Sequence, residues 1–322
     1  MRRLFGRAVA LVPPAAARWI PPSWATEAIL TRMRRDPAWL PPGNLEIAFR
    51  LQGTLRRIAD PDGGNRWLHH RWIRLADELR EDLNDTFAFP PGFAAVCLGV
   101  GTRNGLSFPL LIGLMGAERV EAVEPEPLGE GEEWRLLQGL GETALHALIG
   151  EAHGDASALP RFVHLGPLLR GESLRHSLAP ALSWRQGLAE SPGLAPDSID
   201  LITSRSVMEH VADPAAAYAA MAGSLRLGGV LHHDVDFSGH ETDRFAFYRR
   251  PPAAPGAAFD GLNGLRLSDH VSILRDLGLH VKVKRQLRET GPIERATLAP
   301  RFAKYDDADL LTTRAVLVAQ RN

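Results

Sequence analysis

Glycines gather in a short turn that follows an apolar run. Residues 93–98 predict a buried strand, and Gly99, Gly101 and Gly105 come directly after it. Glycine adopts positive φ without strain and lets a ligand approach the main chain closely. Asn104 lies in the same turn, ahead of a helix predicted over residues 106–115. The pattern indicates a nucleotide-like ligand at the end of this strand.

An acidic residue ends the next predicted strand, residues 119–123. Glu124 stands one strand–helix–strand step after the glycine turn and is followed by Pro125. A carboxylate in this position can accept both ribose hydroxyls of a nucleoside. The glycine turn alone is weak evidence, but together with Glu124 it predicts a nucleoside site.

A polar run occupies another predicted strand, residues 230–235, and its continuation. Strand alternation places His233, Val235 and Phe237 on one face, and His232, Asp234 and Asp236 on the other. Asp236 and His240 should project from the carboxyl end, where sheets of this kind hold ligands.

Histidine suits proton removal near neutral pH. We therefore expect His240 or His210 to be a catalytic base, with Asp236 orienting it. Two alternatives remain for the run: a rim of hydrogen-bonded polar residues, or a metal site of Asp236, His240 and a further carboxylate. The alternative for Glu209-His210 is a structural pair that fixes a turn. The prediction includes no metal.

Strand-like and helix-like segments alternate from about residue 90 onward, which predicts a parallel sheet with helices on its faces. Asp213 and Pro214 predict the start of a helix that Leu227-Gly228-Gly229 ends. Ser268-Asp269 opens another, with Val271, Leu274 and Leu277 on one face. The fold class is α/β: a Rossmann-like, doubly wound, mostly parallel seven-stranded sheet with a helical N-terminal extension. Further strands are predicted over residues 182–185, 199–203, 280–284 and 315–319.

Two domains are expected. Residues 1–88 form a helical extension rich in Arg, Trp and Pro, including an amphipathic helix over residues 65–84 with Leu68, Trp72, Leu75, Leu79 and Leu83 in one stripe. Residues 89–322 form the main domain, with an insertion at about 126–181. Helix-like pieces at 134–140 and 143–149 could shape a substrate pocket or a dimer surface.

The most specific motif is residues 197–211, which read Asp-Ser-Ile-Asp-Leu-Ile-Thr-Ser-Arg-Ser-Val-Met-Glu-His-Val and are followed by Asp213-Pro214 and residues 225–229. This run resembles the class I S-adenosylmethionine-dependent methyltransferase core. The resemblance implies an enzyme that binds S-adenosylmethionine across the carboxyl ends of the strands. It assigns the glycines to the methionine end and Glu124 to the ribose. The remaining cofactor residues that it implies are Gln186, Gly187 and Leu188 near adenine, and Ser204, Arg205 and Ser206 near the sulfonium and the substrate.

Three residues depart from the family pattern: Cys97 replaces an acidic residue, Arg103 a glycine and Leu188 an adenine-side aspartate. They leave open a catalytically degenerate binding or scaffold protein. A nicotinamide-dependent oxidoreductase is disfavoured because the turn has no third glycine in the dinucleotide spacing.

The polar run, with residues 262–266, also resembles methyltransferases of bacterial surface polysaccharide synthesis. This weaker resemblance implies a saccharide or other small-molecule acceptor, methylated on oxygen rather than nitrogen.

Composition narrows the partners. The formal net charge is −1 and no basic stripe is sustained, which argues against a nucleic-acid partner. Lys282, Lys284 and Arg285 are expected on a solvated face. Cys97 is the single cysteine and is expected to be a small buried hydrophobe. No apolar run is long enough to predict a transmembrane helix, so a cytoplasmic location is expected. Peripheral membrane contact by the Trp-rich extension and the oligomeric state stay open.

Overall fold

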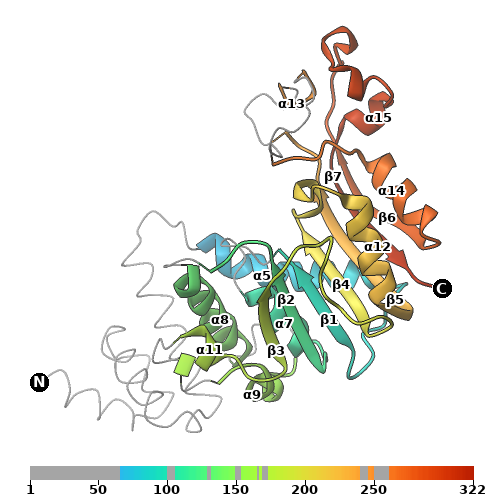
Figure 1. The fold of residues 1–322 in the computed structure, drawn as a ribbon. Coiled ribbons are helices and arrows are strands. Elements are labelled where there is room, and N and C mark those ends of the chain that lie inside the picture. The colour runs from blue at the N-terminus through green and yellow to red at the C-terminus, as the bar shows by residue number, and fades with distance from the viewer. Residues whose placement is uncertain are drawn as a thin grey trace, which may run out of the picture. The chain divides into compact units, whose positions relative to one another are not determined.

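Alternating strands and helices build the fold, as Figure 1 shows. The structure is a computed structural model, and it describes residues 66–99, 106–128, 132–148, 154–164, 167–168, 173–239, 246–249 and 261–322. The predicted helical pieces before residue 66 therefore lie outside the described residues.

Seven strands form one sheet in the order β3-β2-β1-β4-β5-β7-β6. β1, β4 and β5 run parallel, whereas β7 runs antiparallel to both β5 and β6. This topology confirms the predicted Rossmann-like, mostly parallel sheet. The strands are β1 (Ala94–Leu98), β2 (Arg119–Glu124), β3 (Leu182–Gln186), β4 (Ile199–Arg205), β5 (Leu225–Asp236), β6 (His280–Arg288) and β7 (Thr312–Gln320).

Helices connect most of these strands. Among the described helices, the longer ones are α5 (Arg66–Leu83), α7 (Ser107–Leu114), α8 (Glu132–Leu148), α12 (Pro214–Ser224) and α14 (Leu267–Asp276). The short ones are α9 (Leu159–Phe162), α11 (Leu174–Ser177), α13 (Ala246–Arg249), α15 (Asp307–Leu310), and the 3₁₀ turns η2 (Ala156–Ala158), η3 (Met208–His210), η4 (Arg295–Thr297) and η5 (Pro300–Phe302).

The described chain divides into two compact units, each of which has its own packing. The first comprises residues up to Leu79, Val100–Ala122 and Pro127–Trp184; the second comprises Arg80–Gly99, Val123–Glu126 and Arg185–Asn322. The end of α5 groups with the second unit, and the domain boundary expected at residue 88 stays a prediction.

Helix α5 confirms the predicted helix within one residue at each end. Leu75, Leu79 and Leu83 are buried, as the stripe requires. The side chains of Leu68 and Trp72 do not belong to the described part of the structure. Asp82 is also buried, at 3% exposure, on the same helix. The apolar stripe did not predict that carboxylate.

In the first unit, α8 corrects the expectation of two separate helical pieces. One helix spans both pieces, although Gly139 and Gly141 stand in its middle. Leu136, Leu140 and Ala144 are buried at helical spacing, so packing outweighs the low helix propensity of glycine. Close packing also explains Gly113 of α7, where a Cβ would stand 2.7 Å from the Phe162 ring.

In the second unit, α12 and α14 cover one face of the sheet (Figure 1), and their buried side chains join the core of β4, β5 and β7. The side chain of Asp213 caps α12 by accepting a hydrogen bond from the Ala216 N–H at 2.9 Å. On α14 the prediction was partly wrong. Leu277 is 38% exposed, and His270 instead lies on the buried face with Leu274.

The start of β5 also differs from the prediction. The helix ends at Ser224, and Leu227-Gly228-Gly229 belongs to a strand that begins at Leu225. Gly228 has a φ of 79°, and a Cβ on Gly229 would lie 2.8 Å from the Arg226 carbonyl oxygen. The two glycines thus permit an irregular strand start rather than a helix end.

A second, smaller core lies beyond the end of β5. It is aromatic, and buried Arg266 anchors it to the sheet by donating hydrogen bonds to the carbonyl oxygens of Phe237 (2.9 Å) and Asp309 (2.8 Å). The Arg266 guanidinium also lies over the Phe237 and Tyr248 rings, at 5.1 Å and 5.0 Å from their centroids. The members of this core are Phe247, Tyr248, Ala299, Phe302, Tyr305 and Leu310.

Among the described helices, none combines the length and apolar character needed to cross a bilayer.

Candidate functional site

The turn after β1 lies against the turn after β4. Gly99 has a φ of 64°, and its N–H donates to the carbonyl oxygen of Val123 at 2.8 Å. A Cβ at Gly99 would stand only 2.3 Å from Cγ2 of Val207. Glycine is thus required here both by the backbone angle and by the close approach. Gly101, Asn104 and Gly105 lie outside the described residues.

The ends of β2 and β3 lie side by side. The Gly187 N–H donates to the Glu124 carbonyl oxygen at 2.9 Å, and Nε2 of Gln186 donates to the Pro125 carbonyl oxygen at 3.1 Å. Leu188, directly after this pair, exposes 52% of its surface. The structure therefore brings together Glu124, the predicted ribose residue, and the segment predicted for adenine. An exposed leucine at this place offers an apolar surface to a planar ring.

The turn after β4 has an unusual backbone. Ser206 has a φ of 50°, a left-handed conformation that few non-glycine residues adopt. Its N–H donates to the Asp234 carbonyl oxygen at 2.8 Å, which ties the turn to β5. Strained residues of this kind concentrate at functional turns.

Ser204, one of the predicted site residues, turns its side chain into the core. The hydroxyl lies 2.7 Å from Nδ1 of His233, and both residues are buried. The hydroxyl is thus committed to an internal hydrogen bond in this structure. Any contact between Ser204 and a ligand would have to come from its backbone.

The Glu209-His210 pair forms part of η3, which an asparagine clamps. The side-chain amide of Asn263 donates to the carbonyl oxygens of Met208 at 2.6 Å and Val211 at 3.0 Å. The backbone N–H of Asn263 donates to the carbonyl oxygen of Glu209 at 2.9 Å. His210 is exposed, and its Nδ1 is hydrogen-bonded to the Gly261 carbonyl oxygen. Sequence reasoning missed Asn263, because a clamp from a distant loop leaves no local pattern.

Glu209 is buried, with 5% exposure. No side chain of the described residues donates a hydrogen bond to its carboxyl oxygens. Burial raises its pKa to about 8, and the negative charges of Asp236 and Asp234 on β5 add to the shift, which the backbone N–H groups of Glu209 and Asp236 oppose. A carboxyl group in this state holds a proton at neutral pH.

Asp236 ends β5, as predicted from strand alternation. It is half-buried, and its Oδ1 accepts a hydrogen bond from the Ser238 N–H at 2.8 Å. His240, the other predicted partner in catalysis, lies outside the described residues, so the predicted Asp236–His240 pair stays a prediction.

Buried polar rings line the face that α12 and α14 cover. The Tyr218 hydroxyl lies 2.8 Å from Nδ1 of His270, and the Tyr218 ring contacts the His233 ring edge-on. Burial lowers the pKa of His233 to about 3 and that of His270 to about 4. Both imidazoles are therefore neutral near pH 7.

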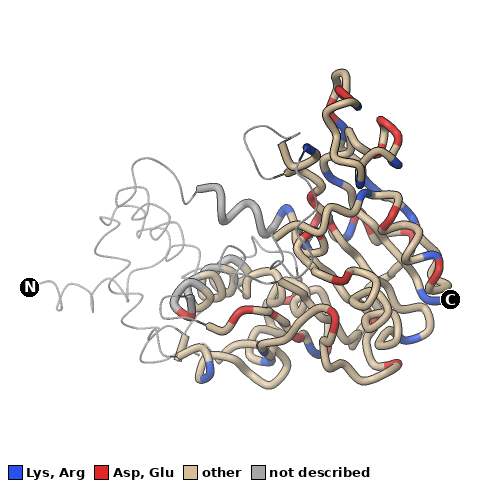
Figure 2. The backbone as a smooth tube through the Cα atoms, turned by 45° about the horizontal axis from the view of Figure 1, so that its top comes forward, with Lys and Arg blue, Asp and Glu red and all other residues tan. Residues whose placement is uncertain are grey.

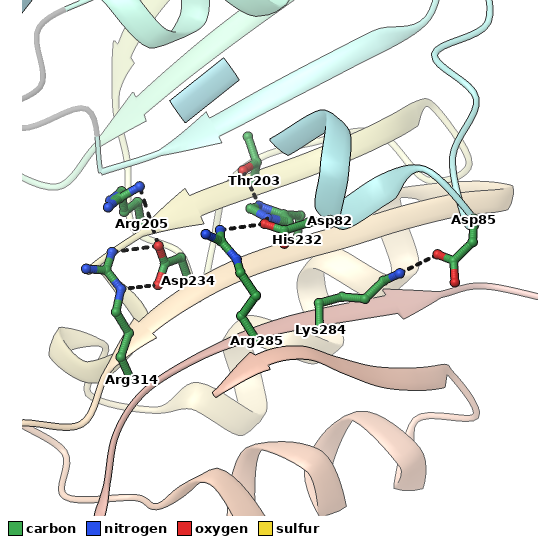
Figure 3. Close-up of polar contacts among 9 residues, drawn as sticks. All are labelled: Asp82, Asp85, Thr203, Arg205, His232, Asp234, Lys284, Arg285 and Arg314. Carbon is green, nitrogen blue, oxygen red and sulfur yellow. Dashed lines mark hydrogen bonds and ion pairs between the residues drawn. The ribbon is translucent and has the colours of Figure 1, made fainter. Parts of the chain in front are cut away.

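On the opposite face of the sheet, the buried charged side chains form pairs. Nε2 of His232 lies 3.1 Å from Oδ2 of Asp82, and Thr203 Oγ1 lies 3.0 Å from Nδ1 of the same ring (Figure 3). Arg285 donates to Asp82 at 2.7 Å. Although burial opposes it, the bonds from His232 and Arg285 lower the pKa of Asp82 below its ordinary value. This group fastens the last turn of α5 to the strands.

Asp234 lies on the same face of the sheet, near the carboxyl end of β5. Nε and Nη2 of Arg314 donate to its two carboxylate oxygens, each at 2.6 Å, and Nη1 of Arg205 lies 3.5 Å from Oδ2 (Figure 3). The predicted site residue Arg205 thus faces Asp234, with its side chain 15% exposed. Strand alternation grouped His232 with Asp234 correctly, but their partners lie far away in the chain.

The basic group on β6 was expected on a solvated face, and this was wrong in part. Lys282 bonds Asp85 at 3.2 Å, Lys284 bonds the other oxygen of Asp85, and Arg285 reaches Asp82. Hydrogen bonds from both lysines lower the pKa of Asp85. Elsewhere acidic and basic residues are interspersed along the described backbone (Figure 2).

Two further observations concern metal and thiol chemistry. In the part of the chain that the structure describes, no three His, Cys, Asp or Glu side chains are arranged to hold a metal ion. Cys97 is buried, and this burial raises the pKa of its thiol, as expected for a small core residue rather than a nucleophile.

Comparison with protein families identifies a methyltransferase-domain segment at residues 168–232. It contains β3, β4, η3, α12 and most of β5. The match confirms the resemblance seen in residues 197–211 and supports an enzyme that uses S-adenosylmethionine. No curated protein sequence matches the chain.

Several solved structures match the chain at low identity and low TM-score. The YcgJ protein from Bacillus subtilis is 13% identical, with 79% of this chain and 99% of that chain covered and a TM-score of 0.42. An S-adenosylmethionine-dependent methyltransferase from Mesorhizobium loti is 14% identical, with 74% and 95% covered and a TM-score of 0.40. Phosphoethanolamine N-methyltransferase 2 from Haemonchus contortus, in complex with S-adenosyl-L-methionine, is 14% identical, with 75% and 52% covered and a TM-score of 0.42.

Proposed function

We propose that this protein transfers a methyl group from S-adenosylmethionine to an oxygen of a small molecule or saccharide. One observation carries the proposal: three turns of one compact unit lie at the same edge of the sheet. The turn after β1 supplies Gly99, the end of β2 the carboxylate of Glu124, and the turn after β3 the exposed Leu188. The methyltransferase-domain match covers the turn after β4 that completes this edge.

The described residues fit such a cofactor. Gly99 has no Cβ, and Val207 packs against it, so the turn after β4 lies directly against the turn after β1. Glu124 is half-buried and can accept ribose hydroxyls, and the backbone pair Glu124–Gly187 sets the adenine segment next to it. Leu188 can cover one face of the adenine ring. When bound, S-adenosylmethionine supplies a methyl group on an already activated leaving group.

The protein's own task is then to align the acceptor and to remove its proton. Asp236 and His240 remain the proposed pair for proton removal, and Arg205 and Ser206 the proposed border of the acceptor. His210 is the second proposed base, and its exposed ring is already oriented by the Gly261 carbonyl. Arg205 is partly exposed and can face an acceptor while it stays near Asp234.

The test is a transfer assay with methyl-labelled S-adenosylmethionine. A panel of nucleotide sugars, glycans, lipid-linked saccharides and small alcohols is offered, with amines as the alternative class. The expected result is label on a hydroxyl-bearing acceptor, at least tenfold weaker with Glu124→Ala than with Glu126→Ala, an exposed neighbour. Label only on amines would contradict the oxygen acceptor. Cofactor binding without transfer to any acceptor would favour a degenerate binding protein, the reading left open by Cys97 and Leu188.

A further inference from the structure

We propose that Glu209 is the counter-charge for the sulfonium of the bound methyl donor, and that it gives up a proton to solvent when this cation arrives. This inference rests on the proposed function and deepens it, because it assigns a residue to the charged centre of the cofactor. The evidence is where Glu209 lies, what it lacks and what surrounds it.

Position comes first. Glu209 lies in η3, the turn that follows β4 at the carboxyl end of the sheet, and Asn263 holds that turn at three carbonyl oxygens. Val207 in the same turn packs so closely on Gly99 that no Cβ fits between them. The Glu209 turn is therefore part of the same edge as the glycine turn proposed to carry the methionine end of the cofactor.

The second point is what Glu209 lacks. Its side chain is more than nine-tenths buried, and no side chain of the described residues donates a hydrogen bond to either oxygen. Leaving a buried carboxyl without a partner is costly, so such groups are rare unless a ligand completes them. Every other buried carboxylate of the described chain, Asp82 and Asp234, has an arginine partner.

The third point is the charge around it. From β5, the negative charges of Asp236 and Asp234 both raise the pKa of Glu209, and Glu209 in turn raises the pKa of Tyr218 on α12. Asp234 is compensated by Arg314 and Arg205. These neighbours favour a positive ligand over a negative one.

The buried guanidinium of Arg266 is committed elsewhere. Nη1 and Nη2 of Arg266 donate to the backbone carbonyl oxygens of Phe237, Asp309, Leu310 and Thr312. Its charge is thus directed at the second core. Glu209 consequently keeps its proton in the free protein, in agreement with a pKa of about 8.

The exchange is balanced. A sulfonium placed beside Glu209 stabilises the carboxylate, so the carboxylic acid loses one proton to solvent and one cation takes its place. After methyl transfer the sulfur is a neutral thioether. The carboxylate then regains its proton, which weakens the hold on the product relative to the substrate.

The experiment is calorimetric titration of the full chain at pH 7 in phosphate and in Tris, whose ionisation enthalpies differ. The difference between the two heats gives the number of protons released. S-adenosylmethionine and S-adenosylhomocysteine are compared, because they differ only in the methyl group and its charge. We expect close to one proton released with the sulfonium ligand and close to none with the thioether.

Two variants sharpen this test. Glu209→Gln should abolish the proton release and reduce the preference for the sulfonium ligand, while Glu126→Gln should change neither. Asp236→Asn removes a neighbouring negative charge, so the pKa of Glu209 should fall and fewer protons should be released at pH 7. Between pH 6 and 8 the affinity of the wild type for S-adenosylmethionine should rise by up to about tenfold per pH unit.

Equal proton release with both ligands would overturn the inference, as would release that persists in Glu209→Gln. The proposed function would survive either result, because both ligands would still bind. Absence of binding by a protein that circular dichroism shows to be folded would overturn both.

Discussion

Two parts of the second unit bury carboxyl groups in opposite ways. On the face beneath α5, Asp82 and Asp234 each receive at least one guanidinium, and Asp82 also receives the His232 ring. At the turn after β4, Glu209 is also buried but has no cationic or other side-chain partner among the described residues.

The difference separates a structural pair from a carboxyl group that we propose to serve a ligand. A compensated carboxylate holds elements together, and its charge is satisfied whether or not a ligand is present. An uncompensated one makes the folded protein less stable above its ordinary pKa, and a cation beside it would offset that cost. The same chemical group stabilises the fold in one place, and in the other its proposed role is to bind a ligand.

The largest effect is expected for Asp82→Ala. Removing this carboxylate leaves His232 and Arg285 without their partner, which should lower the free energy of unfolding by about 3 kcal/mol. Because the pKa of Asp82 is lowered in the folded state, its stabilisation exists above the unfolded value of 3.8 and is lost as the pH falls through the folded value. Urea unfolding at pH 7 and at pH 3 measures this.

Glu81→Ala, an exposed residue on the same helix, is the matched control and should change stability by less than about 0.5 kcal/mol. A loss as small as the control's would mean that the pairs on this face are not structural.

Glu209→Gln should act in the opposite direction. A carboxyl pKa raised from 4.5 to about 8 means that the folded chain holds its proton more tightly than the unfolded chain. Stability is then highest below pH 4.5 and declines until about pH 8. The amide removes this decline, so at pH 7 the variant should be more stable by about 3 kcal/mol.

Urea unfolding of both proteins between pH 4 and 8 checks this prediction. The two curves should coincide at the acid end and separate as the pH rises. A variant that is less stable at pH 8 would show that Glu209 has a stabilising partner, and the comparison between the two regions would fail.

Gly99→Ala tests the close packing of the two turns. The positive φ alone should cost about 1 kcal/mol, and the clash with Val207 should add to it. Gly278→Ala is the matched control, because Gly278 has a φ of 78° but open space around a Cβ. Thermal unfolding should rank Gly99→Ala clearly below Gly278→Ala, and S-adenosylmethionine should bind only to the latter with unchanged affinity. Equal losses would contradict the close approach.

The smallest effect on stability is expected for Leu188→Ala. Because half of this side chain is exposed, stability should change by less than about 0.5 kcal/mol. Affinity for S-adenosylmethionine should fall severalfold if the leucine covers the adenine ring. Leu227→Ala, at 77% exposure, is the control, and an equal affinity in both variants would remove Leu188 from the site.

The sequence predicted the order and type of the strands well, because alternation and turn residues are local signals. It also predicted that His232 and His233 face opposite sides, which period two alone determines. What it could not predict was the partner of each buried charge. Asp82 and Arg285 are far apart in the chain, and neither carries a mark of the other.

The site shows the same limit. Gly99 and Glu124 were predicted from motifs at strand ends and the segment after β3 from the family resemblance, and their cofactor roles stay predictions. The direction of the Ser204 side chain was not predicted, since only the fold reveals that its hydroxyl turns to His233. Glu209 was interpreted through its neighbour His210, and its isolation became visible only when burial and the absence of side-chain hydrogen bonds were seen together.

The most direct test of the central claim is calorimetric titration of the full chain with S-adenosylmethionine, comparing wild type, Glu124→Ala and Glu126→Ala. The account predicts binding at one site per chain, weakened at least tenfold by Glu124→Ala and unchanged by Glu126→Ala. Absence of binding by folded wild-type protein, or binding that Glu124→Ala leaves intact, would contradict a cofactor held at the carboxyl ends of these strands.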